Sequence, residues 1–252
     1  MRTPGTAEHA LRKPALAAKA QKLGRYIQTL SSTQLAAIMH ISPALAAKTH
    51  TTYRAWDAPD TIQSLAIDSF VGDIYSGLRA SSLSVAERNY ADQHLYILSG
   101  LYGVVRPYDT ICPYRLEMGY RLPDTRYRDL YKFWGESIAA CLPASGPIVN
   151  LAAVEYSKTV APFVAPERLV TPTFLTLSPQ TGEPVFVVVH AKIARGAFAR
   201  WLITSQISDV SMLPAFNDIG YVYNSSLSTP DTPAFICQQF GGKGLSMRLS
   251  VS

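Results

Sequence analysis

The sequence lacks the features that mark a membrane or exported protein. No apolar run approaches the roughly 20 residues that a membrane-spanning helix needs. The N-terminal stretch 1–21 is interrupted by prolines and charges and has no continuous apolar segment of the signal-peptide type. We therefore expect a soluble, cytoplasmic monomer that has no membrane partner.

Cysteine and the common catalytic motifs are also scarce. The 252 residues include three cysteines, Cys112, Cys141 and Cys237, without a CxxC pair or a Cys/His ligand spacing. We interpret them as reduced intracellular thiols, the alternative being a metal or disulfide role. The sequence has no GxSxG, HExxH, Walker or dinucleotide-binding motif, and no cluster of iron ligands is visible. We expect no metal site and no cofactor.

Positive charge, in contrast, is present and unevenly distributed. Residues 1–60 carry eight Lys and Arg against three Asp and Glu, a net charge of +5. Residues 61–252 carry 15 of each kind, so that their net charge is zero. This asymmetry indicates a surface for a polyanion, nucleic acid before membrane. The alternative is a solvated helix face.

The basic part of the chain has a helical pattern. Residues 15–30 predict an amphipathic helix whose basic side carries Lys19 and Lys22. Ser31 or Ser32 can cap a second short helix, and Ser42 can cap a third that runs to about residue 56, since proline follows it. Residues 31–56 thus resemble a helix-hairpin-helix element, which holds a DNA phosphate at its turn. Two helices that pack without a ligand are the alternative.

The rest of the chain alternates between predicted helices and strands. Helices are expected over 85–98, 128–142 and 194–207, and buried strands over 101–105, 148–153 and 184–191. This alternation predicts a mixed α/β (α+β) fold, with one domain over residues 1–240 around a central sheet. Residues 241–252 are expected to form a flexible tail.

Three groups of polar residues are candidates for chemistry. Anion binding or structural ion pairing would explain the two arginines of the run 98–119, Arg106 and Arg115. Acid–base work or a capping ion pair would explain the group that follows 148–153, Glu155, Tyr156 and Lys158. Phosphate contact is expected of cations around a helix start near 190–196, Lys192, Arg195 and Arg200. His190, on an apolar segment, is expected to be a core histidine.

Ordered motifs along the chain resemble one known family. They include GDIYSGL at 72–78, LSGLYGVVRPYDTICPYRLEMG at 98–119, YKFWG at 131–135 and NLA at 150–152. Others are EY at 155–156, ARG at 194–196 and FN at 216–217. The chain is identified by them as similar to the YaaA peroxide-stress family from about residue 15 to 238. The resemblance implies one α/β body with a positively charged cleft, a helix-hairpin-helix element, binding of double-stranded DNA, and protection against peroxide by limiting damage from intracellular iron.

The chain departs from this family pattern at three places. The family's opening apolar strand has no counterpart in residues 1–14, Val71 stands where lysine is typical, and Val154 replaces Asp or Asn. We expect either a start codon assigned too far downstream or a truncated member.

Two functions from different classes follow, together with a third interpretation, an inactive paralogue that kept the fold. The first is a DNA-binding protein of the peroxide-stress response that contacts phosphates and helps to limit iron-dependent damage. Its expected DNA or anion contacts are Lys19, Lys22, Ser42, Lys48, Arg54, Arg106, Arg115, Lys158, Lys192, Arg195 and Arg200. The alternative is an enzyme acting on a small anionic ligand, phosphorylated or nucleotide-like. Its candidate catalytic residues are Glu117, Glu155, Tyr156 and Lys158.

Overall fold

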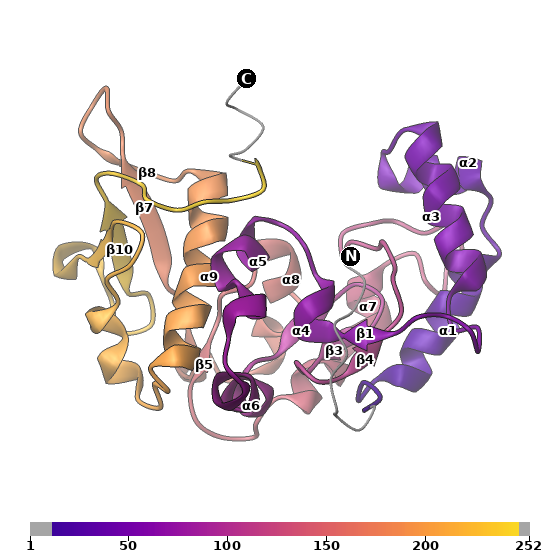
Figure 1. The fold of residues 1–252 in the computed structure, drawn as a ribbon, viewed down its shortest axis with the longest axis horizontal. Helices are drawn as coiled ribbons and strands as arrows, with labels where there is room; N and C mark the ends of the chain where they lie inside the picture. The colour runs from indigo at the N-terminus through magenta and orange to yellow at the C-terminus, as the bar shows by residue number, and fades with distance from the viewer. Residues whose placement is uncertain (1–11, 247–252) are drawn as a thin grey trace. The chain divides into compact units, whose positions relative to one another are not determined.

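The structure, a computed structural model, describes residues 12–246 (Figure 1). The chain divides into two compact units. Within the described residues, unit 1 consists of 12–69, 95–144 and 154–163, and unit 2 consists of 70–94, 145–153 and 164–246. The expectation of one body over residues 1–240 concerns how these units are joined, and it stays a prediction. The residues expected to lack the family's opening strand fall mostly outside the described part.

Unit 1 is mainly helical. Its helices are α1 (Ala17–Gln28), α2 (Ser32–Met39), α3 (Pro43–Ala55), α4 (Ala66–Ser69), α7 (Leu130–Trp134) and α8 (Val154–Ser157). Its strands form two antiparallel pairs, β1 (Ser64–Leu65) with β4 (Thr110–Ile111), and β2 (Ile97–Ser99) with β3 (Gly103–Val105). Short 3-10 turns lie at 135–137, 139–141 and 161–163.

The helices α2 and α3 begin where the capping residues predict. The Ser31 hydroxyl accepts from the Gln34 N–H, and the Gln34 side chain accepts from the Ser31 N–H, which completes a capping box at the start of α2. The Ser42 hydroxyl accepts from the Leu45 N–H at 3.3 Å, and Pro43 occupies the first turn of α3. Together with α1, the helices predicted for the basic part of the chain are therefore confirmed.

The core of unit 1 forms around Trp134. The indole Nε1 of Trp134 donates to the Gly100 carbonyl at 3.1 Å. Gly103 has φ +72° and lies so close to Trp134 that a Cβ there would be 2.9 Å from the indole. A side chain at 103 would therefore be both strained and crowded, which explains the glycine in the β2–β3 hairpin.

Unit 2 contains the largest sheet. Its four strands run in the order β8 (Pro184–Val185), β7 (Thr173–Leu177), β10 (Ala234–Cys237), β9 (Tyr221–Tyr223), and only β7 and β10 are parallel. A separate parallel pair joins β5 (Ile148–Val149) to β6 (Leu169–Val170). The helices are α5 (Asp73–Leu78), α6 (Val85–His94) and α9 (Val188–Thr204), and 3-10 turns lie at 80–82, 166–168, 210–215 and 225–227.

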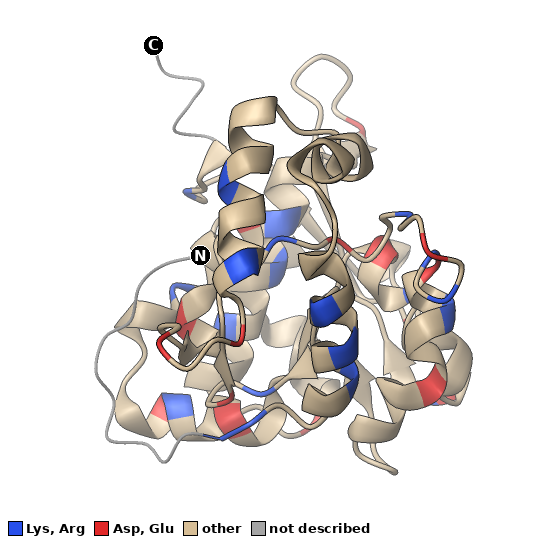
Figure 2. Ribbon diagram, turned by 90° about the vertical axis from the view of Figure 1, so that its right-hand side faces the viewer, with Lys and Arg blue, Asp and Glu red and all other residues tan. Residues whose placement is uncertain are grey.

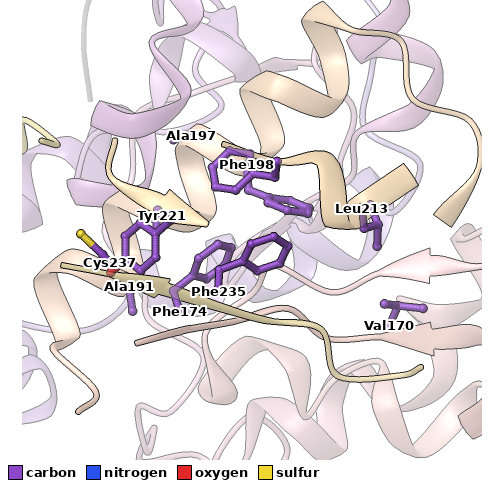
Figure 3. Close-up of a cluster of buried hydrophobic side chains, with 11 residues drawn as sticks. Val170, Phe174, Ala191, Ala197, Phe198, Leu213, Tyr221, Phe235 and Cys237 are labelled. Carbon is purple, nitrogen blue, oxygen red and sulfur yellow. The ribbon is translucent and has the colours of Figure 1, made fainter. Parts of the chain in front are cut away.

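Aromatic side chains fill the core of unit 2 between α9 and the sheet (Figure 3). Phe174 of β7 stacks on Phe235 of β10, with ring centroids 5.5 Å apart, and meets Phe198 of α9 edge to face at 5.6 Å. All three side chains are fully buried. Burial of each such ring contributes about 1.5–3 kcal/mol relative to exposure. This cluster fixes α9 against the sheet.

Two glycines let α5 approach α9 at backbone contact. A Cβ built on Gly196 would lie 1.8 Å from the Ile74 carbonyl oxygen, and one built on Gly77 would lie 2.1 Å from the Ile193 carbonyl oxygen. No side chain fits at either position without moving a helix.

Several predicted elements beyond the basic helices are wrong in extent. The expected strand 184–191 shrinks to Pro184–Val185, because α9 begins at Val188, well before the predicted start at 194. The helix expected over 85–98 ends at His94, because the next segment pairs as β2. The helix expected over 128–142 ends at Trp134, where Gly135 takes φ +51°.

The mixed α and β composition of the prediction is confirmed. The single central sheet is wrong: among the described residues the strands form four separate small sheets. Part of the expected flexible tail is placed, since Ser246 donates two hydrogen bonds to Asp73. Residues 247–252 of that tail lie outside the described part.

Candidate functional site

The first three helices of unit 1 carry no acidic side chain. Between Glu8 and Asp57 the sequence has seven Lys and Arg and no Asp or Glu. Figure 2 shows basic positions and no acidic positions along α1–α3. No carboxylate side chain within residues 9–56 therefore offsets the positive charge of this segment.

The predicted basic residues of this segment differ in solvent exposure and in the contacts that their side chains make. Lys22, Lys48 and Arg54 are exposed, as is the hydroxyl-bearing Ser42 at the start of α3. Lys19 instead points inward: its Nζ donates to the Trp134 carbonyl at 3.2 Å and to the Ser137 hydroxyl at 2.7 Å. Burial lowers the pKa of Lys19. We interpret Lys19 as a tie between α1 and the segment after α7.

The turn between α2 and α3 has no glycine. His40 takes the left-handed conformation there, with φ 50°, and caps the C-terminus of α2. The Ile41 N–H donates to the Ala36 carbonyl at 3.2 Å, so the turn is held by backbone bonds on the α2 side and by Ser42 on the α3 side. The structure thus shows two helices joined by a short turn, whereas the phosphate-binding helix-hairpin-helix element stays a prediction.

An open pocket of about 360 Å³ lies beside this turn. The end of α2 contributes Ala37, Ile38 and His40, and the loop after residue 118 contributes Gly119, Tyr120 and Arg121. Arg121 is held by an ion pair with Asp129, with Nη1 2.9 Å from Oδ2. None of the lining residues was predicted, because nothing in the sequence pairs the α2–α3 turn with the loop at 119–121.

The end of the run 98–119 is joined to α8 by two carboxylates, Glu117 of the run and Glu155 of the helix. The Tyr156 hydroxyl donates to Glu117 Oε2 in a very short hydrogen bond. Glu155 Oε1 accepts from the Gly119 N–H at 2.7 Å. Burial, followed by the charge of Glu117, raises the pKa of Tyr156 far above its ordinary value. Three predicted residues, Glu117, Glu155 and Tyr156, therefore gather in unit 1.

The cations predicted beside these carboxylates do not pair with them. Arg115 and Lys158 are exposed, and within residues 12–246 neither forms an ion pair. The Arg115 side chain hydrogen-bonds the Tyr120 hydroxyl, and the Arg115 carbonyl accepts from the Tyr53 hydroxyl at 2.9 Å. Arg115 is therefore held next to Tyr120, one of the residues that line the pocket, and no carboxylate of residues 12–246 pairs with its guanidinium.

The other arginine of the run has a different environment. The Arg106 guanidinium lies over the Tyr96 ring, 4.2 Å from its centroid, and the Arg106 N–H donates to Asp109. The buried Asp109 also accepts from Arg12 at 2.6 Å. These contacts fix the loop after β3, and anion binding by Arg106 stays a prediction.

The cations of α9 lie inside the helix, which corrects the premise on which they were predicted. Because α9 begins at Val188, Lys192 and Arg195 are in its second turn and not at a helix start. Arg200 donates to the Leu78 and Arg79 carbonyls at 3.3 and 3.2 Å, and so caps α5. Lys192 is exposed, whereas Arg195 is partly buried and its pKa is lowered by that burial.

His190 is also helical, where a strand was expected. It is half-buried, its Nδ1 lies 3.0 Å from the Thr176 hydroxyl, and it stacks on Phe240 with ring centroids 3.9 Å apart. Burial lowers the pKa of His190, which favours the neutral imidazole. These contacts support its interpretation as a packed histidine of unit 2.

Comparison with known proteins places these features in a family. The family model described as "Peroxide stress protein YaaA" matches residues 1–227. The chain belongs to the YaaA peroxide stress protein family. It is 58% identical over 235 residues to a UPF0246 protein of Salinispora tropica, covering 93% of this chain and 89% of that protein. UPF0246 proteins of Shewanella denitrificans and Ralstonia pickettii are 39% and 40% identical, each covering 92% of both chains.

Membership of the YaaA family confirms the resemblance read from the motifs and supports a role in peroxide stress. Within residues 12–246, no helix is long and apolar enough to span a membrane. The two valines at family-typical polar positions, Val71 and Val154, are both exposed, at 49% and 69%. The YaaA motifs fall in both units: the run 98–119 lies in unit 1 and GDIYSGL lies in unit 2.

Proposed function

We propose that this YaaA-family protein binds duplex DNA through its phosphates and thereby helps to limit iron-dependent peroxide damage. The observation that carries the proposal is the acid-free segment 9–56, which folds into α1, α2 and α3 and holds seven cations. Phosphate contact needs cations and N–H donors and no base-reading group. The role in peroxide stress comes from the family, and its link to iron rests on the resemblance described above.

The exposed cations of the segment supply the contacts. Lys22, Lys48 and Arg54 project from α1 and α3, whereas Lys19 is bound within the unit and is not needed. The start of α3 adds one N–H group to these cations. Pro43 has no N–H, the Ser42 hydroxyl accepts from the Leu45 N–H, and the Ser42 carbonyl accepts from the Ala46 N–H, which leaves the Ala44 N–H for a phosphate oxygen.

A fluorescence anisotropy titration with a duplex of about 20 base pairs tests this proposal. At about 50 mM salt the protein should bind, and the logarithm of the affinity should fall linearly with the logarithm of the salt concentration. The triple variant Lys22→Gln, Lys48→Gln, Arg54→Gln should weaken binding and reduce the salt slope by about 2.7, at about 0.9 per lost phosphate contact.

A matched triple variant removes the same charge elsewhere. Arg128→Gln, Lys132→Gln and Lys243→Gln change three exposed cations outside the segment. This control should leave affinity and salt slope close to those of the unchanged protein. Equal losses in both triple variants would show that only net charge matters, and absence of binding at about 50 mM salt would reject the proposal.

A second function, an enzyme acting on a phosphorylated or nucleotide-like compound, is favoured by one observation. Glu155 accepts from Gly119, which lines the pocket of unit 1, Glu117 accepts from the adjacent Tyr156, and neither carboxylate forms an ion pair within residues 12–246. Carboxylates weaken phosphate tracking but suit acid–base chemistry. Thermal-shift screening against nucleotides tests it: stabilisation by a small ligand that Glu155→Ala or Lys158→Ala abolishes would support an enzyme. DNA binding that survives those changes would leave the first function intact.

A further inference from the structure

The pocket at the end of α2 lies next to the end of α3 at which we propose phosphate binding. Its lining residues Ala37, Ile38 and His40 belong to the end of α2 and to the cap that follows it. The Ala44 N–H that remains for a phosphate comes four residues after His40. The other wall, residues 119–121, belongs to the same unit. A strand of DNA held at the start of α3 therefore has the pocket beside it.

The size and the walls of the pocket suit one flat ring. Its volume of about 360 Å³ is at the lower end of the range of roughly 300–1,000 Å³ for small-molecule sites. The wall from α2 is aliphatic at Ala37 and Ile38, and the wall from the loop includes the aromatic Tyr120. Tyr120 is half-buried and held in place, since its hydroxyl bonds the Arg115 side chain and its N–H donates to the Glu117 carbonyl at 3.4 Å. A wall that is already ordered loses little freedom when a ring stacks on it.

The distribution of charge indicates what the ring is attached to. Among the lining residues of the described range only Arg121 is a lysine or arginine, and its guanidinium pairs with Asp129. The exposed cations lie instead on α1 and α3, at Lys22, Lys48 and Arg54. A ligand therefore places an uncharged ring in the pocket and its anionic part on the acid-free segment. Cations spread over two helices suit a chain of phosphates, so we assign the ring to a strand of DNA.

We propose that the pocket binds one unpaired nucleobase of a DNA strand whose phosphates lie on α1–α3. The base leaves the stack of the duplex and lies between Tyr120 and the aliphatic side of α2. Stacking on an aromatic ring tolerates any sequence, because every base has a π face, so the protein recognises an unpaired nucleotide and not a particular base. This inference rests on DNA binding by α1–α3, which it deepens.

Fluorescence anisotropy of the full chain with three labelled duplexes of equal length tests the inference. One duplex is fully paired, one has a single unpaired adenine at its centre, and one has an unpaired abasic residue at the same place. Both bulged duplexes are flexible at the bulge, so their comparison isolates the base from the ease of bending. The duplex with the unpaired adenine should bind about tenfold more tightly than the abasic one, as expected for one base stacked on an aromatic side chain.

Two variants remove the place of the ring in different ways. Tyr120→Ala takes away the aromatic wall, and Ala37→Phe fills the pocket from an exposed position, so that it keeps the bonds that hold the loop. Each should reduce the difference between the two bulged duplexes to nearly none, whereas Tyr120→Phe keeps the ring and should retain the difference. Ala140→Phe adds the same side chain to another exposed alanine of unit 1, which does not line the pocket, and should also retain it.

The triple variant Lys22→Gln, Lys48→Gln, Arg54→Gln separates this inference from DNA binding itself. It should weaken binding of all three duplexes alike and leave the difference between the bulged ones intact. Equal affinity of the unchanged protein for the two bulged duplexes, with normal binding of the paired one, would overturn the assignment of the pocket alone. A difference that survives Ala37→Phe would overturn it as well, and so would adenosine 5′-monophosphate that binds as tightly as the duplex with the unpaired adenine. Absence of binding to any of the three duplexes would reject DNA binding and this inference with it.

Discussion

The contact between α5 and α9 leads to a prediction in which two effects oppose each other. Replacing Gly196 with alanine removes the helix penalty of glycine, which alone would stabilise the protein by about 1 kcal/mol. The new Cβ, however, would lie 1.8 Å from the Ile74 carbonyl oxygen and 2.8 Å from the Leu78 amide nitrogen. Real Cβ atoms stay beyond 3.0 Å from such neighbours, so the Ile74 carbonyl must move before the methyl group fits.

The atom that blocks the new Cβ belongs to the backbone, and this decides whether Gly196→Ala stabilises or destabilises the protein. A side-chain end could rotate away, but the Ile74 carbonyl moves only with α5, and a Cβ on Gly77 of the same helix would lie 2.1 Å from the Ile193 carbonyl oxygen of α9. Overpacking of this kind typically costs about 1–3 kcal/mol and at times more. We therefore expect Gly196→Ala to reduce the free energy of unfolding by about 2 kcal/mol, despite the gain in helix propensity.

Urea unfolding measures this change. At a slope of about 2 kcal/mol per molar urea, the midpoint should fall by about 1 M. Hydrogen exchange of the α5 and α9 amides should rise with it, whereas Gly241→Ala should alter neither. An unchanged or higher midpoint for Gly196→Ala would refute the close approach of the two helices.

Two further predictions concern buried polar groups. Tyr102 and Tyr156 have pKa values raised above the ordinary 10, chiefly by burial. As pH rises, the two phenols lose their protons at a lower pH in the unfolded chain than in the folded protein. The free energy of unfolding should therefore fall above about pH 10, by up to about 1.4 kcal/mol per pH unit for each phenol. Urea unfolding at several pH values measures this fall, which Tyr156→Phe should make shallower. Asp109→Asn should lower the free energy of unfolding by about 1–3 kcal/mol, because it weakens the bond to Arg12, whereas Asp124→Asn at an exposed carboxylate should change it little in the same assay.

The N-terminal helices could be predicted because their signals are local. Ser31 and Ser42 accept from backbone amides three residues later, and Pro43 fits only the first turn of a helix. Such caps act within one turn, so no knowledge of the rest of the fold is required. The same locality explains why the basic residues of α1 and α3 were assigned to helices correctly.

The start of α9 could not be predicted because packing overrides propensity there. Residues 184–189 are rich in β-branched and aromatic side chains, which favour a strand. The helix nevertheless begins at Val188, since Ala191, Ala194 and Phe198 continue its buried face against the sheet. The same face of α9 also packs against β10, which lies far away in the sequence, so no local sequence pattern indicates this contact.

The sequence predicts which polar residues of unit 1 are candidates for chemistry, but it does not predict which of them contact one another. The proximity of Glu117 and Tyr156 joins two motifs that are far apart along the chain, whereas the pocket at His40 and Tyr120 depends on a turn meeting a loop. Both are long-range contacts that spacing does not reveal. The inward direction of Lys19, which bonds Ser137, is another example: a helical wheel shows its face but not the acceptor.

The positive charge of segment 9–56 and the carboxylate group of Glu117 and Glu155 belong to different parts of the sequence, and this bears on whether one surface can bind both DNA and a small ligand. Phosphate tracking along a duplex is weakened by carboxylates, so Glu117 and Glu155 are poorly suited to a DNA surface. The segment 9–56, in contrast, has no carboxylate side chain at all. If α1 and α3 alone account for DNA affinity, the short bond between Tyr156 and Glu117 serves another purpose. DNA affinity and small-ligand binding should then be lost in different variants, and a shared loss would show that one surface performs both.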